Sequence, residues 1–146
     1  MENVNILSVV IATLIPMIVG FIYYNPKVAG NAWMSSLGIT EEDIRTKGKP
    51  AITYSIALIM SFLLAFFLLF FNNGPGQEGE FDTFGHGAFH GVFIGIVVAM
   101  PVLMTNGLFE LKNFKNIFIN IIYWLITLAL MGGVLDVMNH WPNTAA

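Results

Sequence analysis

Residues 51–71 read AITYSIALIMSFLLAFFLLFF, a stretch without a charged side chain and close to the ~20 residues that cross a ~30 Å hydrocarbon core as an α-helix. Three more stretches resemble it, at about residues 4–24, 84–106 and 114–138, and none of the four carries Lys, Arg or Glu in its middle. These runs are too long and continuous for the alternating strands of a membrane barrel. The sequence therefore predicts an all-α integral membrane protein, an antiparallel four-helix bundle.

The composition agrees with a protein that is embedded in lipid. Of the 146 residues, 56% are hydrophobic and 10% are charged, whereas the surface of a soluble domain needs roughly 25% charged residues. The chain has no cysteine, which excludes a disulfide framework, a thiolate metal site and a nucleophilic thiol. Its formal net charge of −3 is too small to indicate a nucleic-acid partner. The partner that the composition predicts is the lipid bilayer.

The four predicted helices form one domain, residues 1–146, with one long connection at residues 25–50. Pro26 ends the first helix, because the residue before a proline is displaced from the helical region, and Pro50 fits the first turn of the second. Between these prolines we expect short interfacial helices. One of them begins at Thr40, whose hydroxyl is suited to cap a helix with acidic residues in its first turn.

The basic residues predict the orientation of the chain. All six lie either between the first two helices or between the last two, namely Lys27, Arg45, Lys47, Lys49, Lys112 and Lys115. Under the positive-inside rule the loops 25–50 and 107–115 are cytoplasmic, so both termini lie on the outer face with the acidic loop of Glu78, Glu80 and Asp82. The predicted location is the bacterial cytoplasmic (inner) membrane, crossed four times.

The third helix carries a stripe of small residues. Gly87, Gly91 and Gly95 recur every four residues, which leaves one helix face without side chains and allows a second helix to approach closely. Gly132 and Gly133 occur at the same depth in the fourth helix and are the expected partners within the chain. A helix from another copy is the alternative partner.

The three histidines lie at the predicted outer end. His86 and His90 are four residues apart, as are Asp136 and His140, so each pair shares one helix face. Imidazole and carboxylate groups from neighbouring helices suit zinc or another divalent transition ion. Two alternatives stay open, since the same side chains can make interhelical hydrogen bonds or respond to protons.

A second polar set lies at the predicted cytoplasmic end. Asn106 and Glu110 flank the last loop, and Asn116 and Asn120 share a face of the fourth helix. Buried amides need hydrogen-bonding partners in lipid, so these residues either bond neighbouring helices or line a polar path. No catalytic triad order, phosphate-binding loop, dinucleotide fingerprint or HExxH motif is present. We therefore expect no catalytic residues and no enzymatic activity.

Short motifs give the chain a family resemblance. Residues 24–26 (YNP), 30–34 (GNAWM) and 37–42 (LGITEE) resemble the YxP, GxxWM and LGLTEE patterns of a family of small bacterial and fungal membrane proteins, catalogued as domain of unknown function 1761. Residues 109–125 and 131–132 are similar to its C-terminal half. The resemblance implies the four-helix topology and brings no activity, cofactor or site residues with it. The histidines are not part of these patterns.

Three functional hypotheses follow. A four-helix chain has little interior, so the first is a homo-oligomeric transporter or channel for a small solute or ion. The second is a non-catalytic accessory or scaffold subunit that packs its glycine face against another membrane protein. The third is a metal-dependent membrane enzyme that uses the outer histidines.

Overall fold

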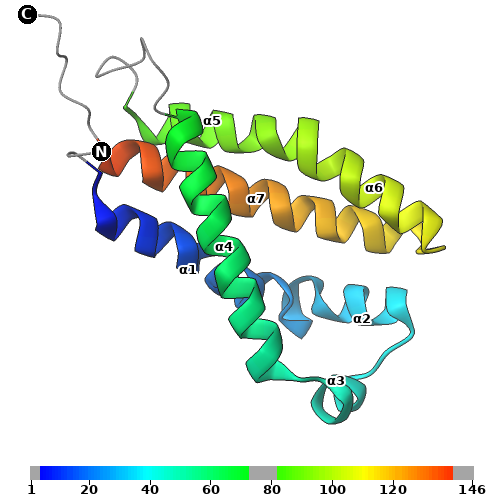
Figure 1. The fold of residues 1–146 in the computed structure, drawn as a ribbon. Helices are drawn as coiled ribbons and strands as arrows, with labels where there is room; N and C mark the ends of the chain where they lie inside the picture. The colour runs from blue at the N-terminus through cyan, green and yellow to red at the C-terminus, as the bar shows by residue number, and fades with distance from the viewer. Residues whose placement is uncertain (1–3, 73–81, 140–146) are drawn as a thin grey trace, which may run out of the picture.

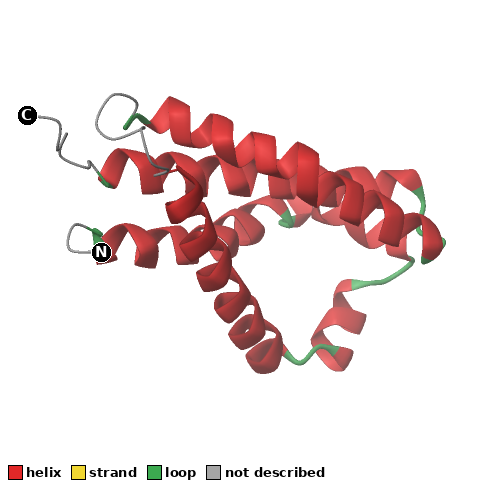
Figure 2. Cartoon of the chain, turned by 45° about the horizontal axis from the view of Figure 1, so that its top comes forward, coloured by secondary structure: helices red, strands yellow, loops and turns green. Residues whose placement is uncertain are grey.

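The computed structural model describes residues 4–72 and 82–139, and every regular element in these two stretches is a helix (Figure 1, Figure 2). Four spans are long and apolar enough to cross a membrane, which confirms the predicted all-α membrane fold. The spans are α1 (Ile6–Tyr23), α4 (Pro50–Asn72), the continuous run of α5 (Phe84–Ile94), η2 (Gly95–Ala99) and α6 (Met100–Phe109), and α7 (Phe114–Met138). Their bounds lie within three residues of the predicted ones.

Polar side chains begin three of the four spans. Asn5, Thr83 and Asn113 stand immediately before α1, α5 and α7, and each side-chain oxygen accepts a hydrogen bond from a backbone N–H of the first turn. Such a cap satisfies one of the backbone donors that a helix leaves unpaired at its start. These starts are therefore encoded locally in the sequence.

The third span is irregular in its middle and at its end. The π-helical turn η2 lies directly before α6, in which Pro101 is the second residue. Proline lacks an N–H and its ring crowds the preceding turn, so wider helical turns accommodate it. The span then continues past the predicted end at residue 106. It closes in a Schellman turn, in which Leu111 adopts a left-handed φ of 57° and the Lys112 N–H donates to the Gly107 carbonyl.

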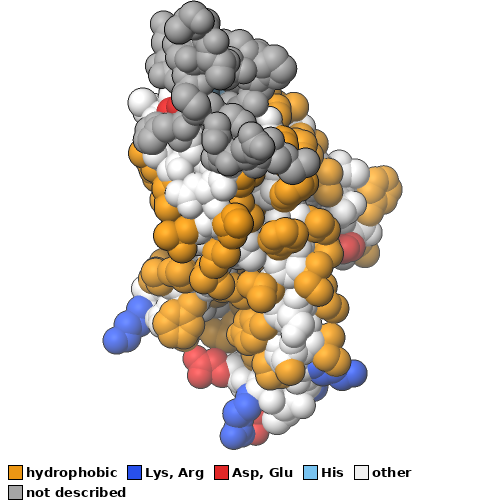
Figure 3. Space-filling model, turned by 60° about the vertical axis from the view of Figure 1, so that its left-hand side comes forward, with side chains coloured by type: hydrophobic (Ala, Val, Ile, Leu, Met, Phe, Trp, Pro, Cys, Tyr) orange, Lys and Arg blue, Asp and Glu red, His pale blue; other side chains and the backbone are white. Residues whose placement is uncertain are grey.

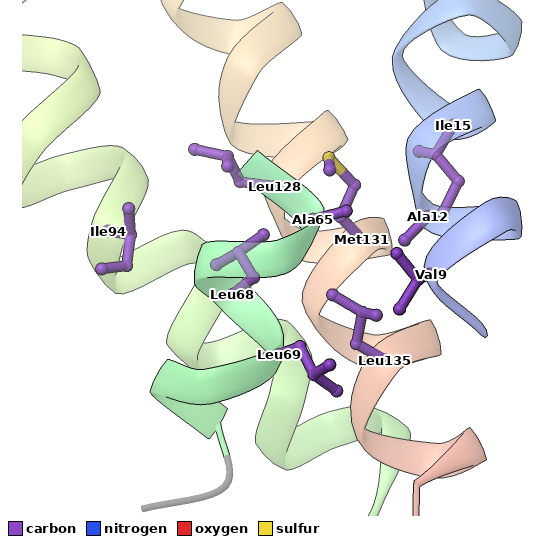
Figure 4. Close-up of a cluster of buried hydrophobic side chains, with 10 residues drawn as sticks. All are labelled: Val9, Ala12, Ile15, Ala65, Leu68, Leu69, Ile94, Leu128, Met131 and Leu135. Atoms are coloured by element: carbon purple, nitrogen blue, oxygen red, sulfur yellow. The ribbon is translucent and has the colours of Figure 1, made fainter. Parts of the chain in front are cut away.

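Helix α7 is the central element of the bundle and contacts α1, α4, α5 and α6. The apolar core lies where α1, α4 and α5 meet the second half of α7 (Figure 4). Its fully or nearly fully buried side chains are Val9, Ala12, Ile15, Ala65, Leu68, Leu69, Ile94, Leu128, Met131 and Leu135.

Helix α4 packs over only half of its length. It crosses the other spans obliquely (Figure 1), and its buried residues all lie between Ser61 and Asn72. The first half, residues 50–60, is exposed on nearly all sides. Because most of these residues are apolar, we expect a lipid or protein surface to cover them.

The connection before α4 contains three short helices. They are η1 (Pro26–Gly30), α2 (Asn31–Leu37) and α3 (Glu41–Lys47). Thr40 caps α3 in a reciprocal capping box with Asp43. Helix α2 packs on the start of α7 through Ser36, which bonds to Asn113 and Asn116.

The two ends of the bundle differ in charge. We call the end where α1 begins and α7 ends the terminal end, and the opposite end, which carries Lys27, Arg45, Lys47, Lys49, Lys112 and Lys115, the basic end. Figure 3 shows an apolar band over the side of the molecule, with Lys and Arg gathered at one end of that face. This distribution is typical of a multi-pass membrane protein.

Candidate functional site

The glycine stripe brings α5 against α7 within the same chain. A Cβ atom added to Gly87 would lie 2.2 Å from the Gly132 carbonyl oxygen, and one added to Gly91 would lie 2.0 Å from the Leu128 carbonyl oxygen. No real Cβ fits at such distances, so the two helices are in backbone contact there. The third residue of the stripe, Gly95, faces the Leu125 side chain, and Gly133 of α7 faces the Phe84 ring.

This close approach places His86 of α5 over Asp136 of α7. The His86 Nδ1 lies 2.9 Å from the Asp136 Oδ2, and the two side chains are 20% and 1% exposed. An ionised carboxylate only accepts hydrogen bonds, so the imidazole donates through Nδ1. The second oxygen of Asp136 is buried and has no hydrogen-bond partner among the described residues. Among the described residues, one hydrogen bond, from His86, therefore offsets the cost of removing the Asp136 carboxylate from water.

The second histidine of α5 is held by α4. The His90 Nδ1 lies 3.2 Å from the Asn72 Oδ1, and the Asn72 Nδ2 donates to the Gly132 carbonyl oxygen at 3.0 Å. Since that carbonyl can only accept, the Asn72 amide is oriented with its oxygen towards His90. His90 is thus the donor through Nδ1. Asn72 is a site residue that the sequence analysis missed, because it lies in a turn-rich stretch that indicates a helix end.

The structure therefore brings three of the four predicted metal ligands together. The His86 and His90 rings have centroids 4.2 Å apart, and Asp136 is hydrogen-bonded to the Nδ1 atom of His86. His140, Glu78 and Glu80 lie outside the described residues. Within residues 4–72 and 82–139, no three His, Asp or Glu side chains converge on a single metal position.

The four residues of the predicted polar path all line one cavity at the basic end. This cavity has a volume of about 160 Å³. Its lining residues are Leu103, Asn106, Gly107, Glu110, Lys112, Asn116, Ile117 and Asn120. The Schellman turn after α6 places Glu110 and Lys112 at its rim, where they form an ion pair with each other. The cavity wall is therefore rich in amides and balanced in charge.

The cavity amides also bond the neighbouring helices. Asn116 accepts from the Asn120 Nδ2 at 3.2 Å and donates to the Ser36 hydroxyl at 2.9 Å. The Asn120 Oδ1 accepts from the Tyr24 hydroxyl at 2.7 Å. Burial and the neighbouring tyrosines raise the pKa of Tyr24 above its usual value, so this hydroxyl stays protonated and remains a donor. Helix bonding and cavity lining are thus served by the same residues.

A polar seam leads from this cavity between α1 and α7. The Tyr123 hydroxyl donates to the Pro16 carbonyl at 2.9 Å. One turn further, Thr127 is fully buried beside Tyr123, and its hydroxyl has no well-formed hydrogen bond to any described residue. Beyond Thr127 the apolar core closes the seam, with Met131 and Leu135 on α7. The polar seam therefore reaches about the middle of the bundle and stops there.

Comparison with known proteins identifies the family. The sequence profile of a family described as "Protein of unknown function (DUF1761)" matches residues 7–136. The match covers most of the chain and confirms the resemblance based on the motifs of residues 24–42. The chain belongs to this family. No curated protein and no solved structure matches it.

Proposed function

We propose that this member of the DUF1761 family is a transport protein for a small neutral or zwitterionic solute, acting as a homo-oligomer in the bacterial cytoplasmic membrane. The observation that carries the proposal is the cavity at the basic end, where the side chains of Asn106, Asn116 and Asn120 converge from two spans. Polar groups inside a membrane bundle are costly, and those that line a cavity often mark a substrate or ion path.

The wall of the cavity indicates the class of solute. Each asparagine offers donors and an acceptor, whereas Glu110 and Lys112 neutralise each other. Such a wall favours a solute that hydrogen-bonds and carries no net charge. A cavity of about 150 Å³ holds a molecule the size of benzene. The volume of about 160 Å³ therefore fits a solute of roughly six heavy atoms.

The proposed orientation makes this cavity an inward-facing vestibule. The positive-inside rule places the basic end in the cytoplasm and the terminal end outside. The apolar core then closes the path to the outside around Met131 and Leu135. Because this core closes the described helices towards the terminal end, we propose that a second copy or a rearrangement of α4 completes the path. The proposal includes no catalytic step.

Uptake of radiolabelled urea, glycine and glycerol into proteoliposomes tests the proposal, with rubidium as the charged comparison. The wild type should accelerate entry of at least one of the three and leave rubidium entry unchanged. Asn120→Leu should lower that rate at least tenfold, because it replaces a cavity amide by an apolar group. Phe118→Leu is the matched control on the lipid-exposed face of the same helix. Equal rates with and without protein for all three solutes would contradict transport.

An accessory subunit is the second candidate, favoured by the unpartnered first half of α4. Ile52, Ile56 and Ile59 are each more than half exposed there. A photoreactive side chain at position 59 separates the two candidates in native membranes. Cross-linking to a second copy supports the homo-oligomer, and cross-linking to one different protein of constant mass supports the accessory subunit. Cross-linking to lipid alone would count against both partners on this face.

A further inference from the structure

We propose that His86 and His90 form a binding site for a divalent transition-metal ion at the terminal end, with Asp136 and Asn72 as the residues that orient the two imidazoles. The ion would bind to the Nε2 atoms. This site is separate from the cavity at the basic end and does not depend on the transport proposal.

The hydrogen-bond partners of the two imidazoles determine which ring nitrogen holds the proton. When Asp136 is ionised, its carboxylate and the amide oxygen of Asn72 are both acceptors, so each neutral histidine holds its proton on Nδ1. The remaining nitrogen, Nε2, then carries a lone pair on the opposite edge of each ring. Histidines that bind metal ions in proteins are usually arranged in this way, with the second N–H of the imidazole donated to a carboxylate, a backbone carbonyl or water.

The distance between the two rings also fits a shared ion. Two imidazoles on one tetrahedral ion, each bonded at about 2.0–2.1 Å, have ring centres roughly 5 Å apart. The ring centroids of His86 and His90 are 4.2 Å apart and the rings are inclined at 59°. The observed separation is therefore close to that of two imidazoles that share one ion. Spacing by one helical turn on α5 keeps the two rings on the same face.

The buried carboxylate points independently to a cation. Asp136 is 1% exposed, and its Oδ1 has no hydrogen-bond partner in the described part of the chain. A lone neutral donor compensates a buried negative charge poorly. An ion on the Nε2 atom of His86 makes the Nδ1 proton more acidic and strengthens its bond to Asp136. The bound cation would thus compensate the carboxylate through the imidazole.

The ligand set selects the class of ion. Imidazole suits zinc, copper and nickel, whereas magnesium and calcium prefer oxygen ligands. Copper(II) binds such sites most strongly among the divalent first-row ions. Water would complete the coordination, since no three His, Asp or Glu side chains of the described residues are placed to hold one ion together.

The test uses the full chain, purified in mild detergent with a tag that contains no histidine and stripped with a chelator. Titration with copper(II) should end at one ion per chain. Electron paramagnetic resonance should then show nitrogen coupling, and His90→Ala should have one coupled nitrogen fewer than the wild type and at least 100-fold weaker binding. Phe93→Ala is the matched control on the exposed face of the same helix and should bind as the wild type does.

Two further variants test the orienting residues. Asn72→Ala and Asp136→Asn should each weaken binding about 10–100-fold with an unchanged number of coupled nitrogens. If His90→Ala does not fold, His90→Gln replaces it, with folding checked by thermal unfolding without metal. Unchanged copper affinity in the histidine variant, or no bound ion in the wild type, would overturn the site. Unchanged affinity in both orienting variants would overturn the roles of Asn72 and Asp136.

Discussion

The two halves of the bundle are built in opposite ways from the same helices. At the terminal end α5 and α7 are in backbone contact, and the polar side chains there are held by specific partners on other helices. At the basic end α4 leaves the bundle, and the amides of α6 and α7 surround a cavity. The comparison indicates a rigid half that fixes geometry and an open half that can admit a solute.

The largest effect is expected from a substitution that forces α5 and α7 apart at the terminal end. In Gly91→Leu the new side chain would collide with the Leu128 backbone, because even a Cβ at position 91 would lie 2.0 Å from the Leu128 carbonyl oxygen. Backbone cannot move aside as a side chain can. We therefore expect the free energy of unfolding to fall by more than about 3 kcal/mol, which is above the usual range for overpacking. Thermal unfolding and size-exclusion chromatography in detergent measure the effect.

The control for that substitution lies in the same helix. Gly85 has no neighbouring atom within 4 Å of its added Cβ, so Gly85→Leu should change the midpoint of unfolding little. Equal midpoints of unfolding for Gly91→Leu and Gly85→Leu would show that the glycine face is not a packing surface. The terminal end could then not be described as the rigid half.

A second comparison concerns one amide in each half. Asn72→Ala leaves the partly buried His90 Nδ1–H without its acceptor, which should lower the free energy of unfolding by up to about 1–3 kcal/mol. Asn120→Ala removes a partner of the Tyr24 hydroxyl beside the cavity, where water can replace it, and should cost less than about 1 kcal/mol. Chemical denaturation of both variants under one condition measures the difference. A larger loss in the Asn120 variant would reverse the assignment of rigid and open halves.

These residues also show what could be predicted from the sequence. The spans and the partners Gly87 and Gly132 follow from local patterns, hydropathy over about 20 residues and small residues at a spacing of four. The cavity residues share a helix face or a short loop, which a single sequence displays. Asn72 could not be found in this way, because its contact with His90 depends on the crossing of α4 over α5. Nor could the exposed half of α4, since an apolar helix gives no periodic signal for the side that packs.

The smallest expected effect lies outside the membrane spans, in the capping box that begins α3 at the basic end. Asp43 accepts hydrogen bonds from the Lys47 ammonium and from the side chain and backbone of Thr40, and these lower its pKa from 3.8 to about 2. A depressed pKa means that the folded state favours the carboxylate, so the contribution to the stability of α3 is complete above about pH 3.8 and is lost as the pH falls through about 2. Titration of the Asp43 carboxyl by NMR in detergent micelles measures this value directly. Lys47→Ala should raise the pKa of Asp43 towards 3.8, because it removes the largest of the lowering interactions, whereas the exposed Lys27→Ala should leave it unchanged. A wild-type carboxyl that titrates near 3.8 would mean that the capping box does not form in solution, and that the basic end is open in its connecting helices as well as in α4.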